Sequence, residues 1–269
     1  LNYLSANFDD VLIGRFFGAR PLGFFQKAHE ILRIPLRQIN SPIGSVAVPM
    51  LSRLVDEPQK YRRTYLRILE KTILLTMPLG VVMIATSEWI IFLVLGEQWL
   101  DAGPIFIALG IGLFYKPISN TTGWLFISQD RTNHMMRWGA MGSAMSITSF
   151  IVGLPWGPIG VAAAYSVSGA VIRAPILLWY VCREGPVSTL DIYKRCFPFV
   201  FGAGVVGVAL YAFRRWSGIE HPVYGLLSAL AITIVVYLIS LVILPSGRRA
   251  LADVKTMVKM LKKEDAKTD

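Results

Sequence analysis

The sequence lacks the residue patterns that most enzymes need. It contains no phosphate-binding loop of the form G-x-x-x-x-G-K-[ST] and no serine or cysteine in a recognisable nucleophile turn. Its two cysteines, Cys182 and Cys196, match no zinc or redox spacing and are interpreted as structural. The three histidines lie in separate segments, without neighbouring metal ligands. We therefore expect no enzymatic activity, no metal site and no cofactor; the histidines are His29, His134 and His221.

The chain also has little charge for its length. Only 16% of its 269 residues are charged, 54% are hydrophobic, and the mean hydropathy is +0.53. A soluble domain of this size is far less apolar, so the composition predicts an integral membrane protein. The net charge of +10 is accordingly interpreted by its position in the loops, and we expect no nucleic-acid partner.

Long apolar segments separated by polar turns predict an all-α membrane protein. Tryptophans near segment ends, such as Trp89 and Trp99, are typical of the membrane interface. We expect about eight transmembrane helices. They are Tyr3–Phe17, Leu22–Leu54, Leu66–Leu95, Ala102–Ile127, His134–Leu154, Ile159–Val181, Phe197–Phe213 and Tyr224–Leu244.

Basic residues are concentrated in alternate loops. The segments Gly96–Gly103 and Gly153–Pro158 contain no Lys or Arg, whereas the loop after Leu54 and the tail after Ser246 are strongly basic. Cytoplasmic loops carry an excess of Lys and Arg, so both ends of the chain are predicted to be cytoplasmic. The chain has no signal peptide and begins at Leu1 within a membrane segment, and we expect it to be truncated at its N-terminus.

The stretch from Leu22 to Leu54 is long enough to cross a membrane and yet contains charged residues. At 100° per residue Lys27, Glu30, Arg33 and Arg37 fall within roughly a third of the helix circumference. An ionisable residue near the bilayer centre costs about 2.5 to 3.5 kcal/mol on insertion scales, so this face is predicted to border a protein interior or a watery cavity. The alternative is a structural helix in which Glu30 pairs with Lys27 and Arg33 at i,i+3 spacing.

The same stretch contains three prolines at a seven-residue spacing, Pro35, Pro42 and Pro49. Each removes a backbone donor and displaces the carbonyl four residues earlier, so a bent helix is expected. In a membrane the freed carbonyls need neighbouring helices, side chains or water, which again favours a polar cavity beside this helix. We interpret the prolines as a hinge.

Further polar residues lie inside later apolar segments. Lys116 and Asn120 are near the middle of one segment, and Arg173 directly precedes Ala174 and Pro175 in another. With Lys27, Arg33 and Arg37 these cations outnumber the embedded carboxylates, which favours an anionic ligand such as a phosphate or pyrophosphate. The alternative is that the carboxylates form structural salt bridges with some of the cations. The carboxylates are Asp9, Asp10 and Glu30.

Four short motifs carry a resemblance to a known family. They are Asn7–Ala19 (NFDDVLIGRFFGA), Leu22–Phe25 (LGFF), Val48–Leu54 (VPMLSRL) and Leu95–Trp99 (LGEQW). In this order and spacing they resemble the Wzx-like lipopolysaccharide and capsular polysaccharide flippases. That family is part of the multidrug/oligosaccharidyl-lipid/polysaccharide (MOP) exporter superfamily, and the motifs cover much of the first hundred residues.

The resemblance implies a fold and a function. It implies the C-terminal bundle of a two-bundle transporter, with six helices in residues 1–184, two additional helices in 185–245 and a basic amphipathic cytoplasmic tail in 246–269. It also implies a flippase that moves an undecaprenyl-pyrophosphate-linked oligosaccharide across the bacterial inner membrane by alternating access. The implied partners are the anionic lipid-linked oligosaccharide, a missing N-terminal bundle of the same protein and a polysaccharide polymerase.

The resemblance also implies roles for the predicted site residues. The substrate would bind a cationic cavity of Lys27, Arg33, Arg37, Lys116, Asn120 and Arg173. Asp9, Asp10 or Glu30 would couple ions to transport. Two alternatives stay open: a drug or cation antiporter of the same superfamily, and a membrane scaffold that recruits polysaccharide-assembly enzymes through its basic loops and tail.

Overall fold

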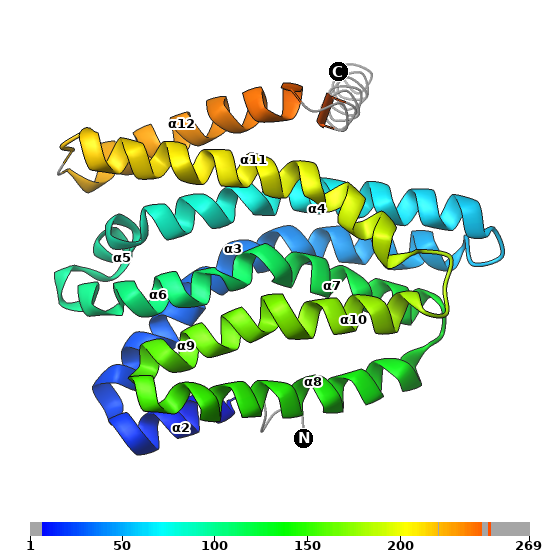
Figure 1. The fold of residues 1–269 in the computed structure, drawn as a ribbon, viewed down its shortest axis with the longest axis horizontal. Coiled ribbons are helices and arrows are strands. Elements are labelled where there is room, and N and C mark those ends of the chain that lie inside the picture. The colour runs from blue at the N-terminus through cyan, green and yellow to red at the C-terminus, as the bar shows by residue number, and fades with distance from the viewer. Residues whose placement is uncertain (1–6, 220, 244–246, 249–269) are drawn as a thin grey trace, which may run out of the picture.

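A computed structural model describes residues 7–219, 221–243 and 247–248, and every regular element in these ranges is helical. The helices run side by side along one common direction (Figure 1). The predicted all-α class is confirmed. The helices are α2 (Phe8–Phe17), α3 (Ala19–Ser52), α4 (Pro58–Ala85), α5 (Ser87–Leu95), the 3-10 turn Glu97–Ala102, α6 (Gly103–Gly110), α7 (Gly112–Ser128), α8 (Thr132–Gly153), the 3-10 turn Leu154–Trp156, α9 (Gly157–Ser168), the π-helical turn Gly169–Arg173, α10 (Ala174–Cys182), α11 (Thr189–Trp216) and α12 (Pro222–Ile243).

Each of the eight predicted segments overlaps a helix, but two of them are interrupted. The segment predicted over 66–95 divides at Thr86, whose hydroxyl donates to the Val82 carbonyl at 2.7 Å. The segment predicted over 102–127 bends by 46° near Ile111. The first interruption falls on the short polar run Thr86–Glu88 and the second in apolar sequence, and both lie within segments whose overall hydropathy predicts a continuous helix.

Among the described residues, four helical stretches are long and apolar enough to cross a membrane, or five if the bent pair counts as one span. The predicted number of eight is therefore not confirmed. One of the four, Thr132–Cys182, folds back on itself after Gly153, so that α8 lies antiparallel to α9 and α10 (Figure 1). α3 is not among them because it carries many polar residues and three prolines.

Glycines at the connection between α8 and α9 allow these two helices to pack closely against each other. A Cβ atom placed on Gly153 would lie 2.5 Å from the Gly160 carbonyl oxygen, so a larger side chain would push the two helices apart. Gly157, at the start of α9, has a φ of +73°, a backbone conformation that glycine adopts at little cost. Small residues at this corner thus allow α8 to pack closely against α9.

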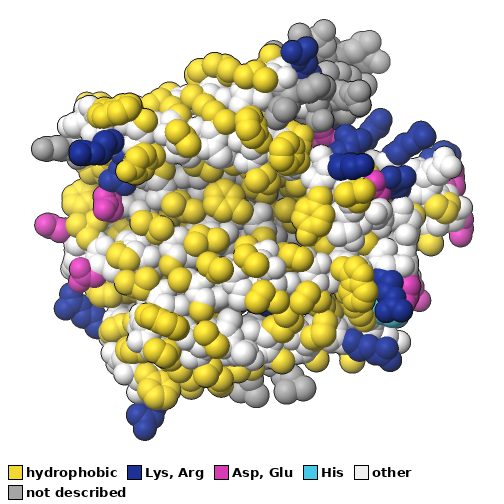
Figure 2. Space-filling model, in the orientation of Figure 1, with side chains coloured by type: hydrophobic (Ala, Val, Ile, Leu, Met, Phe, Trp, Pro, Cys, Tyr) yellow, Lys and Arg dark blue, Asp and Glu magenta, His cyan; other side chains and the backbone are white. Residues whose placement is uncertain are grey.

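The outer surface is largely apolar. Figure 2 shows hydrophobic side chains over most of the visible face and Lys and Arg gathered toward the ends of the helices. On α11 and α12, Phe197, Val208 and Ile234 are 64%, 72% and 60% exposed. Large apolar side chains this exposed on adjacent helices suit a lipid environment rather than water.

Several sequence predictions fall on residues outside the described ranges. Of the predicted amphipathic tail in 246–269, only residues 247–248 are described. The first predicted segment is described from Asn7 onward.

Candidate functional site

A polar cavity of about 570 Å³ lies among α2, α3, α7, α8 and the α9–α10 arm. Two further hollows of about 560 and 460 Å³ adjoin it along α3, and Arg33 lines all three. We call the three together the central groove. Its lining brings together five of the six predicted substrate-binding residues from separate helices: Arg33, Arg37, Lys116, Asn120 and Arg173.

Arg173 is held by neutral groups. One guanidinium nitrogen donates to the Ser146 hydroxyl at 2.5 Å, and the other donates to the Tyr165 carbonyl at 2.6 Å and to the Tyr115 hydroxyl at 3.4 Å. The guanidinium also lies 4.3 Å from the centre of the Tyr165 ring. These contacts fix its orientation and leave its positive charge unneutralised.

A local irregularity of the helix places Arg173 in this position. Residues Gly169–Arg173 form a single π-helical turn, and Pro175 follows it without a backbone N–H. Such turns are often found at functional sites because they re-aim side chains. Gly169 makes room for the arrangement, since a Cβ atom there would lie 2.0 Å from the Tyr115 hydroxyl.

Lys116 approaches the same aromatic ring from α7. Its ammonium nitrogen lies 5.3 Å from the centre of the Tyr165 ring, which also stacks on Phe150 at 5.0 Å between ring centres. Tyr165 therefore contacts two cations of the groove at once. An electron-rich ring face attracts both cations and so stabilises their proximity.

Arg33 and Arg37 lie one turn apart on α3, and their side chains are exposed. Among the described residues neither forms an ion pair, and the same holds for Lys116 and Arg173. Asn120, on α7, is exposed in the hollow that Arg37 also lines. The groove thus presents four cations and an amide to a ligand.

Lys27 is the exception among the predicted cations. Its ammonium lies 2.9 Å from a Glu30 carboxylate oxygen, and it lines none of the three hollows. The structural alternative, an i,i+3 pair of Glu30 with Lys27, is confirmed, whereas no ion pair forms between Glu30 and Arg33 in the described ranges. The structure gives no geometric support for Lys27 as a cavity residue.

The predicted carboxylates lie at the α2 side of the groove. Asp9, Asp10 and Glu30 line the hollow of about 460 Å³ together with Arg33 and Arg37. Asp10 accepts a hydrogen bond from the Gln26 amide at 3.0 Å. Asp9 is 6% exposed, and its Oδ1 has no hydrogen-bond partner among the described residues. The salt bridges predicted for Asp9 and Asp10 do not occur among those residues.

The three prolines of α3 lie within one continuous helix. Ser45 donates to the Pro42 carbonyl at 2.8 Å and so satisfies one backbone acceptor within the helix. Pro35 is half-buried, whereas Pro42 and Pro49 are exposed. The helix continues through the prolines, and their role as a hinge stays a prediction.

Sequence reasoning did not single out Tyr115 and Tyr165. A tyrosine in an apolar helix usually packs in the core, and nothing in its local sequence shows that a cation from another helix will reach it. The position of Tyr115 directly before Lys116 was the available signal. Among the described residues, no group of three or more His, Cys, Asp or Glu is arranged to hold a metal ion.

These features define the class of protein: an all-helical, multi-pass membrane protein with a cation-lined groove between its helices. Residues 1–104 match the profile of a family described as polysaccharide biosynthesis protein. This match and the similar proteins described next confirm the family resemblance that the four sequence motifs indicated.

Curated relatives support the same assignment. The chain is 33% identical over 138 residues to the teichuronic acid biosynthesis protein TuaB of Bacillus subtilis, a match that covers 51% of this chain and 29% of TuaB. It is 22% identical over 153 residues to the lipopolysaccharide biosynthesis protein WzxC of Escherichia coli, covering 57% of this chain and 31% of WzxC. The amylovoran biosynthesis protein AmsL of Erwinia amylovora is 21% identical over 85% of this chain and 54% of AmsL. The chain thus spans between about a third and about half of the length of these relatives.

A solved structure shares the fold. The lipid II flippase MurJ, in its inward closed conformation, superimposes with a TM-score of 0.68 at 21% sequence identity. The superposition covers 89% of this chain and 51% of MurJ. The chain therefore shares the fold of the matching part of MurJ.

Proposed function

We propose that the protein translocates a lipid-linked anionic oligosaccharide, carried on undecaprenyl pyrophosphate, across the bacterial inner membrane. The observation that supports this proposal most directly is the set of cations in the central groove. Arg33 and Arg37 on α3, Lys116 on α7 and Arg173 in the turn before α10 form no ion pair among the described residues. A pyrophosphate group offers the charge and the acceptor oxygens that such a set lacks.

In this proposal the polar residues of the central groove bind the substrate, position another residue or couple ions to transport. Arg33 and Arg37 bind the pyrophosphate, Lys116 and Arg173 bind the pyrophosphate or acidic sugars, and Asn120 donates to sugar oxygens. Tyr165 and Ser146 position Arg173 through the hydrogen bonds and the ring contact described above. Asp9, with its unpartnered Oδ1 in the groove, is the strongest of the ion-coupling candidates Asp9, Asp10 and Glu30.

The transport cycle that we propose is alternating access. A second helical bundle would close the groove from its open side, and bending of α3 at Pro35, Pro42 or Pro49 would let the two bundles rock against each other. We place the basic ends of the bundle, including the starts of α4 and α11, on the cytoplasmic side. A polysaccharide polymerase is the partner that would use the translocated product.

The experiment is translocation of a fluorescent lipid-pyrophosphate oligosaccharide in proteoliposomes that contain the native full-length protein. We expect the Arg33→Leu/Arg37→Leu variant to lose at least about tenfold in initial rate, because hydrogen bonds to charged groups contribute about 1.5 to 3 kcal/mol each. Arg53→Leu/Arg137→Leu is the matched control, because it removes two exposed arginines that line none of the three hollows. An unchanged rate in the groove variant, with correct folding, would contradict the proposal.

A further inference from the structure

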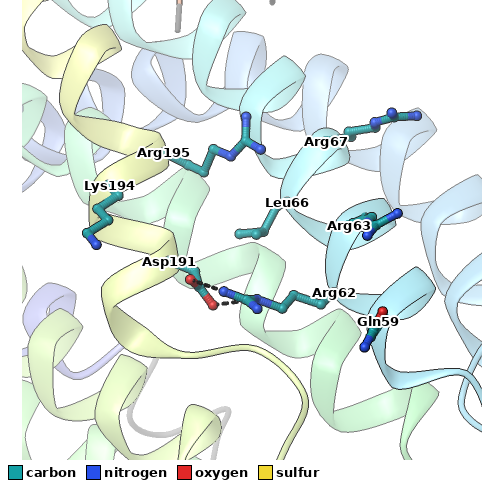
Figure 3. A pocket seen from close by; sticks show the side chains of 8 residues that line it. All are labelled: Gln59, Arg62, Arg63, Leu66, Arg67, Asp191, Lys194 and Arg195. Atoms are coloured by element: carbon teal, nitrogen blue, oxygen red, sulfur yellow. Dashed lines mark hydrogen bonds and ion pairs between the residues drawn. The ribbon is translucent and has the colours of Figure 1, made fainter.

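A second basic cavity lies outside the central groove, between the starts of α4 and α11. Its volume is about 680 Å³. Five cations line it: Arg62, Arg63 and Arg67 from α4, and Lys194 and Arg195 from α11. We call it the α4–α11 pocket. Figure 3 shows Arg62 and Arg195 extending from opposite helices across the pocket, with Leu66 between them.

Carboxylates neutralise only part of this charge. Arg62 forms a two-pronged pair with Asp191, with one nitrogen 2.7 Å from the Oδ2 atom, and Arg195 lies 3.1 Å from Glu70. Within the described part of the chain, Arg63, Arg67 and Lys194 form no hydrogen bond or ion pair. Three like charges around one cavity repel each other unless an anion lies among them.

The ion pairs also make the pocket rigid. Asp191 accepts from the Ser188 backbone N–H at 3.1 Å, and the Ser188 side chain caps the first turn of α11. The same carboxylate therefore fixes the start of α11 and holds the Arg62 guanidinium across the gap from α4. A ligand would meet Arg62 and Arg195 already in place, which lowers the entropic cost of binding, while Arg63, Arg67 and Lys194 keep their charge free for it.

The position of the pocket along the helices indicates the source of the anion. Phe197, Val200 and Phe201 follow Lys194 and Arg195 within two helical turns, and they are 64%, 49% and 49% exposed. On α4, the exposed Leu75 follows Arg67 by eight residues. The cations thus lie just beyond the apolar, lipid-facing surface, at the depth where phosphate headgroups lie.

We propose that the α4–α11 pocket binds the phosphate headgroup of an anionic phospholipid of the surrounding membrane, with Arg63, Arg67 and Lys194 as its free cations. The lipid would join the ends of two helices that are distant in sequence. This site is separate from the central groove, and the proposal does not depend on which substrate the protein transports.

The test measures the lipid that the protein retains. The native full-length protein is reconstituted in nanodiscs of phosphatidylcholine with a minor fraction of phosphatidylglycerol, extracted, and analysed by native mass spectrometry. We expect Arg63→Gln/Arg67→Gln/Lys194→Gln to retain about tenfold less phosphatidylglycerol than wild type. The control Arg53→Gln/Arg137→Gln/Arg183→Gln removes the same charge outside the pocket and should retain the wild-type amount. Equal retention in the pocket variant and wild type would overturn the proposal.

A second variant and a competition experiment test the proposal further. Asp191→Asn removes a negative charge from the pocket and frees Arg62 as a fourth cation, while it keeps an acceptor for the Ser188 N–H. We expect the gained attraction for an anion to outweigh the lost positioning of Arg62, so phosphatidylglycerol retention should increase even if the triple variant folds poorly; unchanged or lower retention would contradict the proposal. Inorganic phosphate in large excess should displace little lipid, since a free ion has no acyl chains to contact Phe197 and Val200. Complete displacement would show that the pocket takes a free phosphate instead.

Discussion

The central groove and the α4–α11 pocket are both lined by cations, yet the two regions hold them differently. At the pocket, Asp191 of α11 pairs with Arg62 of α4, and Glu70 of α4, beside the pocket, pairs with Arg195 of α11. In the groove, the contacts of Arg173 are hydroxyl groups, a backbone carbonyl and an aromatic ring. Carboxylates cancel charge, whereas neutral acceptors and rings orient a cation and leave its field intact.

This difference separates two uses of basic residues in one membrane protein. At helix ends, where water and headgroups reach, an ion pair can join two helices at little desolvation cost. Along the membrane-embedded part of a helix an unpaired cation is costly, and it persists when a cavity or a ligand compensates for it. We therefore expect substitutions in the groove to change transport and substitutions in the pocket to change lipid retention.

Arg173→Met should produce the largest effect. The variant keeps a flexible, unbranched stem about as long as the aliphatic part of arginine but removes the guanidinium that Ser146 and Tyr165 orient. Because charge-assisted hydrogen bonds to phosphate are about twice as strong as neutral ones, we expect the initial translocation rate in proteoliposomes to fall about 100-fold. Arg183→Met is the matched control, since Arg183 is exposed and lies over Trp179 rather than in the groove. Similar rates in the two variants would mean that the charge of Arg173 has no part in translocation.

Gly169→Ala should have an intermediate effect. The new methyl group would lie 2.0 Å from the Tyr115 hydroxyl and 2.8 Å from a nitrogen of Arg173, so the π-helical turn must shift. Overpacking of this kind costs about 1 to 3 kcal/mol, and we expect a lower thermal unfolding midpoint and a translocation rate reduced about tenfold.

Gly204→Ala on α11 is the control for this change. Among the described residues no atom outside its own turn of helix lies within 4 Å of the position that its Cβ would take, so the unfolding midpoint should stay at the wild-type value or rise slightly, because alanine is favoured over glycine inside a helix. If the two variants have the same unfolding midpoint and translocation rate, the close packing around Gly169 does not position Arg173.

The positions of the helices were largely predictable, because hydropathy reports burial in lipid directly. The segment predicted over 224–244 corresponds to α12 at Pro222–Ile243, and that predicted over 197–213 lies within α11. The interruptions at Thr86 and Ile111 were not predicted. The break at Thr86 falls on the short polar run Thr86–Glu88, which is too short to divide a long apolar segment in a hydropathy profile. The bend near Ile111 lies in an apolar stretch, where hydropathy contains no signal for it.

The sites were predictable only as separate residues. Arg33, Lys116 and Arg173 attracted attention because charge is costly in an apolar helix, and the fold brings them to one cavity. Tyr165 carries no such signal. The α4–α11 pocket joins residues more than 120 positions apart, such as Arg62 and Asp191, so the sequence shows only two ordinary basic loops.

Lys27→Gln should have the smallest effect, although Lys27 lies on the same helix as Arg33. Six residues separate the two, which places them about 120° apart around the helix axis. Lys27 already pairs with Glu30 at 2.9 Å, and an exposed ion pair within one helix contributes little to stability. We expect the translocation rate to change less than about twofold. The comparison variant is Arg33→Gln, which removes the same charge from a different face of α3. If Lys27→Gln slowed translocation as much as Arg33→Gln, a cation paired with a carboxylate would matter for transport as much as an unpaired one. The contrast between paired and unpaired cations would then fail within α3 itself.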